Sequence, residues 1–168
     1  MRPSEVRRAQ RPDARAIAAI YNQGIEDRVA TFRTRPIEAP EVEAWLEAGE
    51  RFPVLVRESG GAVEGWSRVV PYSESAFYAG VGEYMLYVER RARRRGTGRA
   101  LLEGVCAEAQ RLAYWKLIGK LFTDNRPSIA LAHACGFRDV GVHLRHGRLD
   151  GEWRDVLVME RLLGEAAA

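Results

Sequence analysis

Residues 83–102 read Glu83-Tyr84-Met85-Leu86-Tyr87-Val88-Glu89-Arg90-Arg91-Ala92-Arg93-Arg94-Arg95-Gly96-Thr97-Gly98-Arg99-Ala100-Leu101-Leu102, and this stretch decides the fold. It passes from an apolar strand, 83–88, through a basic turn with two glycines into an amphipathic helix that continues to about residue 112. The free N–H groups of a first helical turn and the helix dipole both favour an anion. Gly96 and Gly98 let phosphates approach the backbone, and the arginines around them add charge-assisted hydrogen bonds. The stretch therefore predicts a diphosphate site.

Two nucleotide-binding motifs compete for these glycines, and neither fits. A Walker loop needs lysine and then serine or threonine after its last glycine, whereas Gly98 is followed by Arg99-Ala100. A dinucleotide-binding fold needs three glycines in an early strand–helix–strand unit, whereas this turn has two glycines in the middle of the chain.

The hydrophobic periods on either side of this stretch predict a single α+β domain over residues 1–168, with 164–168 as a frayed tail. Strands are expected over 5–9, 52–57, 63–70, 83–88, 115–121, 137–144 and 152–161, the last two joined across Gly147 and Asp150-Gly151. Helices are expected after residue 13, over 40–50, over about 101–112 and over 128–134. This order predicts a mixed, mostly antiparallel sheet of six to seven strands with helices on both faces.

Composition narrows the class of protein. Apolar residues make up 46% of the chain and charged residues 29%, which is typical of a globular protein. No apolar run is long enough to span a membrane, and no apolar core follows Met1–Glu5, so we expect a cytoplasmic protein without membrane contact. The net charge of +3 is mostly scattered, which argues against nucleic acid. Cys106 and Cys135 are expected to be reduced and buried, and no metal site is expected, His143 and His146 included.

Three segments together resemble the GNAT N-acetyltransferases. They are the Arg93-x-x-Gly96-x-Gly98 loop, Asn125-Arg126-Pro127-Ser128 leading into Leu131, and Cys135-Gly136-Phe137. Within that superfamily the chain is similar to phosphinothricin, arsinothricin and methionine sulfoximine acetyltransferases. The segments that carry this similarity are Ile20-Tyr21-Asn22, 29–34, 82–88 and 151–156. The resemblance implies the GNAT fold and acetyl transfer from acetyl-CoA to the amine of a small amino-acid-like molecule, usually by a homodimer.

The resemblance also implies roles for particular residues. Glu83 would be the general base, although it could instead be a solvated strand-end residue or pair with a nearby arginine. The acceptor would lie near Phe32, Arg33, Tyr72 and Tyr78. The 93–99 loop would bind the pyrophosphate of the cofactor. The cofactor as a whole would be held by Leu86, Tyr87, Val88, Arg93, Arg94, Arg95, Gly96, Thr97, Gly98, Arg99, Asn125 and Ser128.

The chain departs from the family pattern in two places. Ala132 stands where related enzymes carry a tyrosine or histidine acid, and His133 points about 100° away, so we expect His133 to be a partly exposed helix residue. Tyr87, a water molecule or an unassisted thiolate would then complete the reaction. The 73–77 loop carries no cation for a substrate oxyanion, unless Arg33 or Arg68 supplies one. A peptide N-terminus or polyamine as acceptor, and a non-catalytic acyl-CoA-binding module, therefore remain alternatives.

Overall fold

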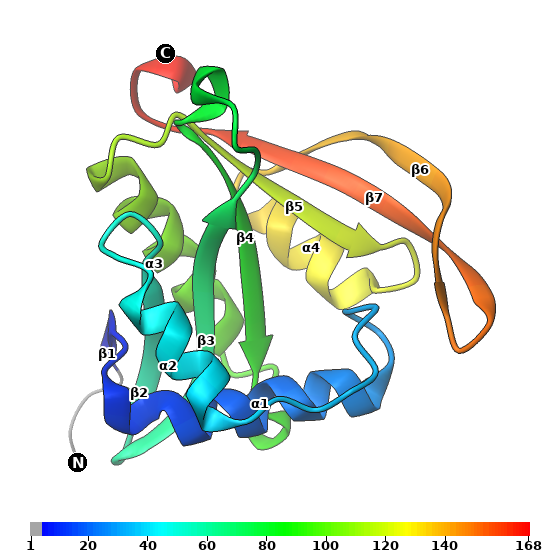
Figure 1. Ribbon diagram of the computed structural model, residues 1–168. Coiled ribbons are helices and arrows are strands. Elements are labelled where there is room, and N and C mark those ends of the chain that lie inside the picture. The colour runs from blue at the N-terminus through cyan, green and yellow to red at the C-terminus, as the bar shows by residue number, and fades with distance from the viewer. Residues whose placement is uncertain (1–4) are drawn as a thin grey trace.

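The strands form one seven-stranded sheet in the order β1-β2-β3-β4-β5-β7-β6 (Figure 1). The structure is a computed structural model that describes residues 5–168, so Met1 and the three residues after it lie outside the description. The strands are β1 (Glu5–Arg8), β2 (Val54–Ser59), β3 (Ala62–Pro71), β4 (Val81–Val88), β5 (Lys116–Phe122), β6 (Arg138–Leu149) and β7 (Glu152–Leu162). Neighbouring strands are antiparallel, except that β4 and β5 are parallel. The predicted mixed, mostly antiparallel sheet is confirmed.

Helices cover both faces of this sheet, as the sequence predicts. On one face α1 (Ala14–Asp27) and α2 (Ala39–Glu47) bury Ile17 and Val42 against Trp66 of β3. On the other face α3 (Thr97–Arg111) and α4 (Arg126–Ala134) share a second buried cluster with Leu117 and Met159. Short 3-10 turns occupy Arg11–Asp13, Ala76–Tyr78, Arg90–Ala92 and Gly164–Ala167.

The largest difference from the predicted boundaries is in β6. This strand continues through Gly147 to Leu149, beyond the predicted end at residue 144, so only Asp150-Gly151 forms the turn to β7. The pairing shifts register between His143 and Gly147, where Arg145 has a φ of 50°. A local irregularity of this kind lets a strand continue past extra residues. Residues 164–167, predicted as a frayed tail, form an exposed 3-10 turn.

A glycine allows α1 to lie close against β4. A Cβ built on Gly24 would lie 2.5 Å from Cδ1 of Tyr87, which is closer than real side chains approach. The Tyr87 ring stacks on Trp66, with ring centroids 5.1 Å apart. Its hydroxyl donates to the carbonyl oxygen of Ala30, just beyond the end of α1. Gly24 thus permits the packing that orients Tyr87.

No helix within residues 5–168 is long and apolar enough to cross a membrane. Across the same described residues, no group of three or more histidine, cysteine, aspartate or glutamate side chains gathers as a metal site would require.

Candidate active site

The site lies where the sheet divides between its two parallel strands. The pairing of β4 with β5 covers Val81–Glu83 and Lys116–Ile118, whereas the strands themselves run on to Val88 and Phe122. Figure 1 shows β4 and β5 together at one end and apart at the other. Beyond Glu83, the edge of β4 that faces β5 therefore borders a cleft instead of a strand.

One half of the cleft is a cavity of about 500 Å³, here called the loop cavity because the 93–99 loop forms one side of it. The helix begins there at Thr97, after Gly96 in the left-handed region with a φ of 82°. Gly98 lies on the wall, where a Cβ would be 3.1 Å from Cδ2 of Leu131. The lining includes ten of the predicted cofactor residues: Leu86, Tyr87, Val88, Arg93, Arg94, Gly96, Gly98, Arg99, Asn125 and Ser128.

The basic loop is anchored to α1 through Asp27. The Arg93 guanidinium lies 2.7 Å from one carboxylate oxygen of Asp27, and the Arg90 guanidinium lies 2.7 Å from the other. Burial raises the pKa of Asp27, but the hydrogen bonds from both arginines outweigh that effect and hold the pKa below its ordinary value. Asp27 therefore stays ionised and holds the start of the loop in place.

Two of the predicted cofactor residues point elsewhere. Thr97 is 1% exposed, and its hydroxyl is hydrogen-bonded to Glu64 of β3 and Arg57 of β2. Arg95 is exposed and does not line the loop cavity. The backbone N–H groups of both residues still belong to the turn and the first turn of the helix.

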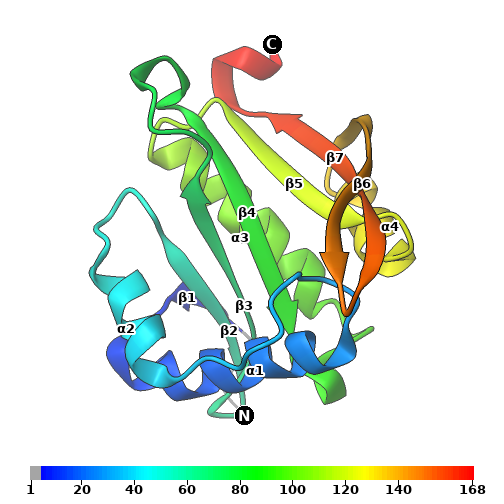
Figure 2. The same ribbon diagram turned by 45° about the vertical axis from the view of Figure 1, so that its right-hand side comes forward.

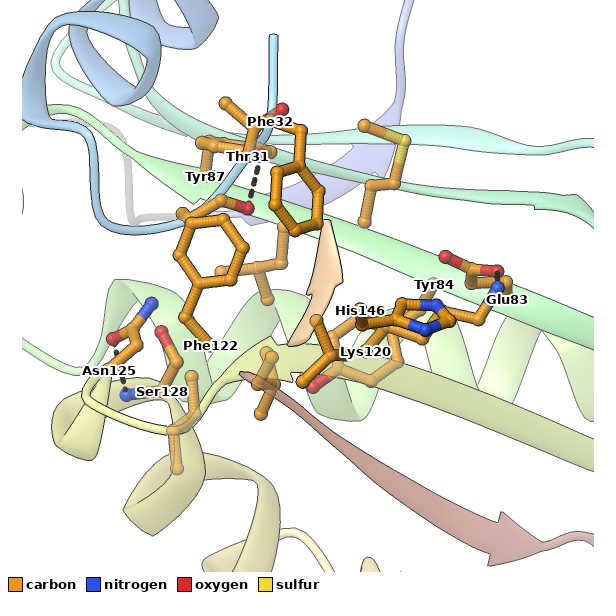
Figure 3. A pocket seen from close by; sticks show the side chains of 16 residues that line it. Thr31, Phe32, Glu83, Tyr84, Tyr87, Lys120, Phe122, Asn125, Ser128 and His146 are labelled. Atoms are coloured by element: carbon orange, nitrogen blue, oxygen red, sulfur yellow. Dashed lines mark hydrogen bonds and ion pairs between the residues drawn. The ribbon is translucent and has the colours of Figure 1, made fainter. Parts of the chain in front are cut away.

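The other half of the cleft is a cavity of about 350 Å³, here called the Glu83 cavity (Figure 3). The Glu83 carboxylate forms an ion pair with Lys120 of β5 at 2.7 Å. Phe32 covers this cavity, with its ring edge-to-face against Phe122 at 4.8 Å and in contact with the backbone at Gly147. A paired Glu83 was one of the expected possibilities, but the expected partner was an arginine and not this lysine.

The segment between α1 and α2 closes the cleft from above. The Asn125 amide donates to the carbonyl oxygen of Val29 at 3.1 Å, while its own oxygen caps the first turn of α4. Arg28 reaches Asp150 at the tip of the β6–β7 hairpin at 2.8 Å, and Figure 2 shows the segment passing close to that tip. Under the segment the two cavities meet, at Ala30, Leu86, Tyr87, Asn125, Ser128 and Leu131.

The other predicted acceptor residues do not line the Glu83 cavity. The Arg33 guanidinium is held by both carboxylate oxygens of Glu41, at 2.7 and 2.8 Å. Tyr72 and Tyr78 pack edge-to-face at 5.7 Å in a neighbouring cavity of about 430 Å³, here called the tyrosine cavity. That cavity shares only Lys120 with the Glu83 cavity. The acceptor roles of Arg33, Tyr72 and Tyr78 stay predictions.

The geometry of α4 leaves fewer candidates for the general acid. Ala132 is fully buried, and neither it nor His133 lines the cleft. His133 is exposed, as predicted, and its Nε2 lies 2.7 Å from Asp139. Tyr87 lines both cavities where they meet, although burial raises its pKa well above the ordinary value for tyrosine.

Several residues of the Glu83 cavity were not predicted from the sequence. Lys120 could have been found from the sequence, because it is a single charge within the otherwise apolar stretch 117–122 of a central strand. Thr31 lies in the 29–34 segment of the family resemblance but was given no role, and Phe122 carried no distinguishing signal. His146 was considered only as a metal ligand, whereas here its ring lines the cavity and stacks on His143 at 4.6 Å.

The sequence and the fold both match known proteins. Residues 17–137 match the family model described as the GNAT acetyltransferase family. The chain is 30% identical to the L-methionine sulfoximine/L-methionine sulfone acetyltransferase of Salmonella typhimurium, over 97% of this chain and 96% of that protein.

Two solved structures show the same architecture. One is a phosphinothricin acetyltransferase from Sinorhizobium meliloti in complex with acetyl-CoA, with a TM-score of 0.91, 29% identity, and coverage of 98% of this chain and 90% of that one. The other is a ribosomal-protein-alanine N-acetyltransferase from Brucella melitensis, with a TM-score of 0.91, 33% identity, and coverage of 95% and 99%. The chain belongs to the GNAT acetyltransferase family and is an acetyl-CoA-dependent N-acetyltransferase.

Proposed function

We propose that this enzyme acetylates the α-amine of a small amino-acid-like acceptor, with Glu83 as its general base. The observation that carries the proposal is the placement of Glu83 at one end of a continuous cleft whose other end is the 93–99 loop. An acceptor amine beside Glu83 would therefore lie next to the open edge of β4, which leads toward the loop that suits a pyrophosphate.

The proposed reaction assigns a task to each part of the cleft. The acceptor arrives as an ammonium ion, and Glu83 removes its proton directly or through one water molecule. The free amine attacks the thioester carbonyl carbon, so that a C–N bond forms and the C–S bond breaks. Backbone groups of Leu86, Tyr87 and Val88 would hold the pantetheine arm and polarise that carbonyl. The nitrogen of the tetrahedral intermediate loses its second proton to water, and the departing thiolate takes a proton from water or from the Tyr87 hydroxyl, which then regains one from water.

The cofactor is proposed to bind along the loop cavity. The side chains of Arg93, Arg94 and Arg99 and the N–H groups of the first turn of α3 would bind the pyrophosphate. Asn125 and Ser128 lie where the two cavities meet, which suits a contact with the pantetheine.

The acceptor class is proposed from the relatives and from the size of the site. The methionine sulfoximine and phosphinothricin enzymes act on compounds built on an amino acid, and arsinothricin is a third compound of that kind. The Glu83 cavity, about 350 Å³ and covered by Phe32, suits a small molecule of this kind. The likeness to a ribosomal-protein-alanine N-acetyltransferase favours a second candidate, a peptide N-terminus, as does the lack of a cation in residues 73–77.

A thiol-release assay with acetyl-CoA tests the proposal. The acceptor panel holds L-phosphinothricin, arsinothricin, L-methionine sulfoximine, L-methionine sulfone, ordinary amino acids, a polyamine and alanine-initiated peptides. Turnover of one or more amino-acid compounds, with none for the peptides, is the expected result. Turnover of the peptides alone would replace the first candidate by the second, and no turnover at all would contradict both.

The proposal also includes a cytoplasmic homodimer. Both cysteines are free and buried, which suits a reducing compartment. The edge strand β6 exposes Val140, Val142 and Leu144, the last at 76%, and a second copy of the chain would cover such an apolar strand. Sedimentation equilibrium of the wild type and of Leu144→Glu tests this point. A monomeric wild type at micromolar concentration would contradict it.

A further inference from the structure

Lys120 is an unassigned cation in the acceptor half of the cleft. Among the described residues that line the Glu83 cavity, it is the only lysine or arginine. Its ammonium group lies 2.7 Å from the Glu83 carboxylate, with the two side chains 41% and 22% exposed. Figure 3 shows the pair at one end of the cavity, joined by a dashed line. A paired lysine beside a proposed base needs an explanation.

The parallel pairing of β4 and β5 brings these residues together. Glu83 and Ile118 are the last residues paired before the two strands separate. Lys120 lies two residues beyond Ile118, and therefore on the same face of β5. The ion pair thus joins β4 to β5 at the point where the cleft opens.

Other cations near the acceptor are engaged elsewhere. Arg33 is held by Glu41 in a two-point ion pair. Arg68 is 9% exposed, lies over the Trp45 ring at 4.4 Å and does not line the Glu83 cavity. The 73–77 loop carries no lysine or arginine. Lys120 is therefore the cation in place to meet an anionic group on the acceptor.

We propose that Lys120 binds the acceptor's carboxylate and makes the enzyme selective for free α-amino acids; this rests on the proposed function above. The Glu83–Lys120 pair has the same two charges as the zwitterionic head group that it would bind. On binding, the ammonium takes Glu83 as its partner and the carboxylate takes Lys120, so one ion pair is exchanged for two. The flexible, partly exposed lysine side chain can turn to admit the acceptor.

The same exchange disfavours acceptors that lack the carboxylate. A polyamine, an amino-acid amide or a peptide N-terminus would take Glu83 and leave Lys120 without its partner. An unmatched, partly buried charge is unfavourable. Lys120 would thus act as a specificity-determining residue, which separates the two candidate acceptor classes.

The experiment compares an amino acid with its amide. The probes are L-methionine sulfone and L-phosphinothricin, each beside its α-carboxamide, in the thiol-release assay with acetyl-CoA. The wild type should prefer the acids about 10- to 100-fold in kcat/KM, the value of one charged hydrogen bond. Lys120→Met should lower kcat/KM for the acids by about the same factor, mainly through KM, and change the amides by less than about threefold. Lys120→Arg should keep the preference.

Lys116→Met is the matched control. Lys116 lies on the same face of β5, and its ion pair with Glu160 at 2.8 Å is in the tyrosine cavity. Arg138 also contacts Glu160, so that carboxylate keeps a partner in the variant. The control should leave the preference for acids unchanged. Stabilisation by coenzyme A should persist in all three variants, because neither lysine lines the loop cavity.

Each result decides the proposal. Collapse of the acid-to-amide ratio in Lys120→Met alone supports it. An equal fall for acids and amides would mean that Lys120 only positions Glu83, and an unchanged ratio would mean that it does neither; both overturn the proposal while acetylation of amino acids stands. A wild type that turns over neither acid contradicts the proposed function itself, and the role of Lys120 falls with it.

Discussion

Replacing Gly24 by alanine should destabilise this protein, although alanine is the better helix former. Gly24 lies within α1, where the added methyl carbon would be 2.5 Å from Cδ1 and 2.6 Å from Cε1 of Tyr87. The Tyr87 ring cannot easily retreat. It stacks on Trp66 at 5.1 Å, it touches Tyr21 at a centroid distance of 4.7 Å, and its hydroxyl is hydrogen-bonded to Ala30.

Two opposing effects set the size of the change. Helix propensity favours alanine over glycine by about 1 kcal/mol. Overpacking a close-packed site costs about 1 to 3 kcal/mol, and the confined Tyr87 ring places this site in the upper half of that range. The net loss in the free energy of unfolding is therefore about 1 to 2 kcal/mol, or about 2 to 8 °C in Tm for a chain of this size.

Urea unfolding and thermal melts of Gly24→Ala measure this loss. In a Tyr87→Leu background, where the ring is absent, Gly24→Ala should instead stabilise by up to about 1 kcal/mol. Gly104→Ala in α3 is the control, because its nearest neighbour is a methyl group of Val6 at 2.9 Å, which can move more easily than a confined ring. A Gly24→Ala protein more stable than the wild type would refute the packing argument.

Three further predictions concern catalysis, the loop over the cleft, and pH. Glu83→Gln should lower kcat about 100-fold or more while stabilisation by coenzyme A persists, since Glu83 does not line the loop cavity; a near-normal kcat would remove its role as base. Asn125→Ala removes both the acceptor for the Ser128 N–H and the donor to the segment above the cleft, and should cost about 2 kcal/mol in urea unfolding. Asn125→Asp keeps the oxygen that caps α4 and loses only the amide donor, so it should lower the free energy of unfolding by less. Equal losses in the two variants would contradict a stabilising role for the cap. Hydrogen bonds from Arg111 and then from Arg8 lower the pKa of Glu108 from 4.5 to about 2, so its stabilisation is complete above about pH 4.5 and is lost as the pH falls toward 2. Glu108→Gln should therefore lower the free energy of unfolding by about 1 kcal/mol at pH 7, a value reduced because solvent screens ion pairs with exposed arginines. This difference from the wild type should shrink between pH 5 and pH 2.

The loop cavity, where the cofactor is proposed to bind, could be predicted because its determinants are local. Strand, turn and helix follow one another over 83–102, and hydrophobic period, glycines and arginines all act within that stretch. The exceptions within it are Arg95, which is exposed and does not line the loop cavity, and Thr97, whose side chain is hydrogen-bonded to Glu64 of β3. Local sequence sets where the turn lies, but the packing of α3 on the sheet decides which side of the turn faces the cleft.

The acceptor side depended on contacts between distant parts of the chain. Glu83 was predicted as the base from the family resemblance, but its ion-pair partner Lys120 comes from another strand that lies beside it only because β4 and β5 pair in parallel. Arg33 was expected at the acceptor, which stays a prediction, and its ion pair with Glu41 of α2 could not be foreseen from the sequence. The direction of a loop side chain is set by whichever opposite charge or packing surface the fold brings near it, and no period in the sequence carries that information.

By itself, therefore, the sequence determined the α+β class, the order of elements, and the turn at Gly96 and Gly98 that suits a pyrophosphate. Only the tertiary structure decided that the sheet divides after Glu83, and that Lys120 meets Glu83 at the point of division. The physical reason is the distance along the chain over which each effect acts. Helix dipoles, glycine backbones and hydrophobic periods act within a few residues, whereas an ion pair across parallel strands exists only once the helix between them has packed and set their register.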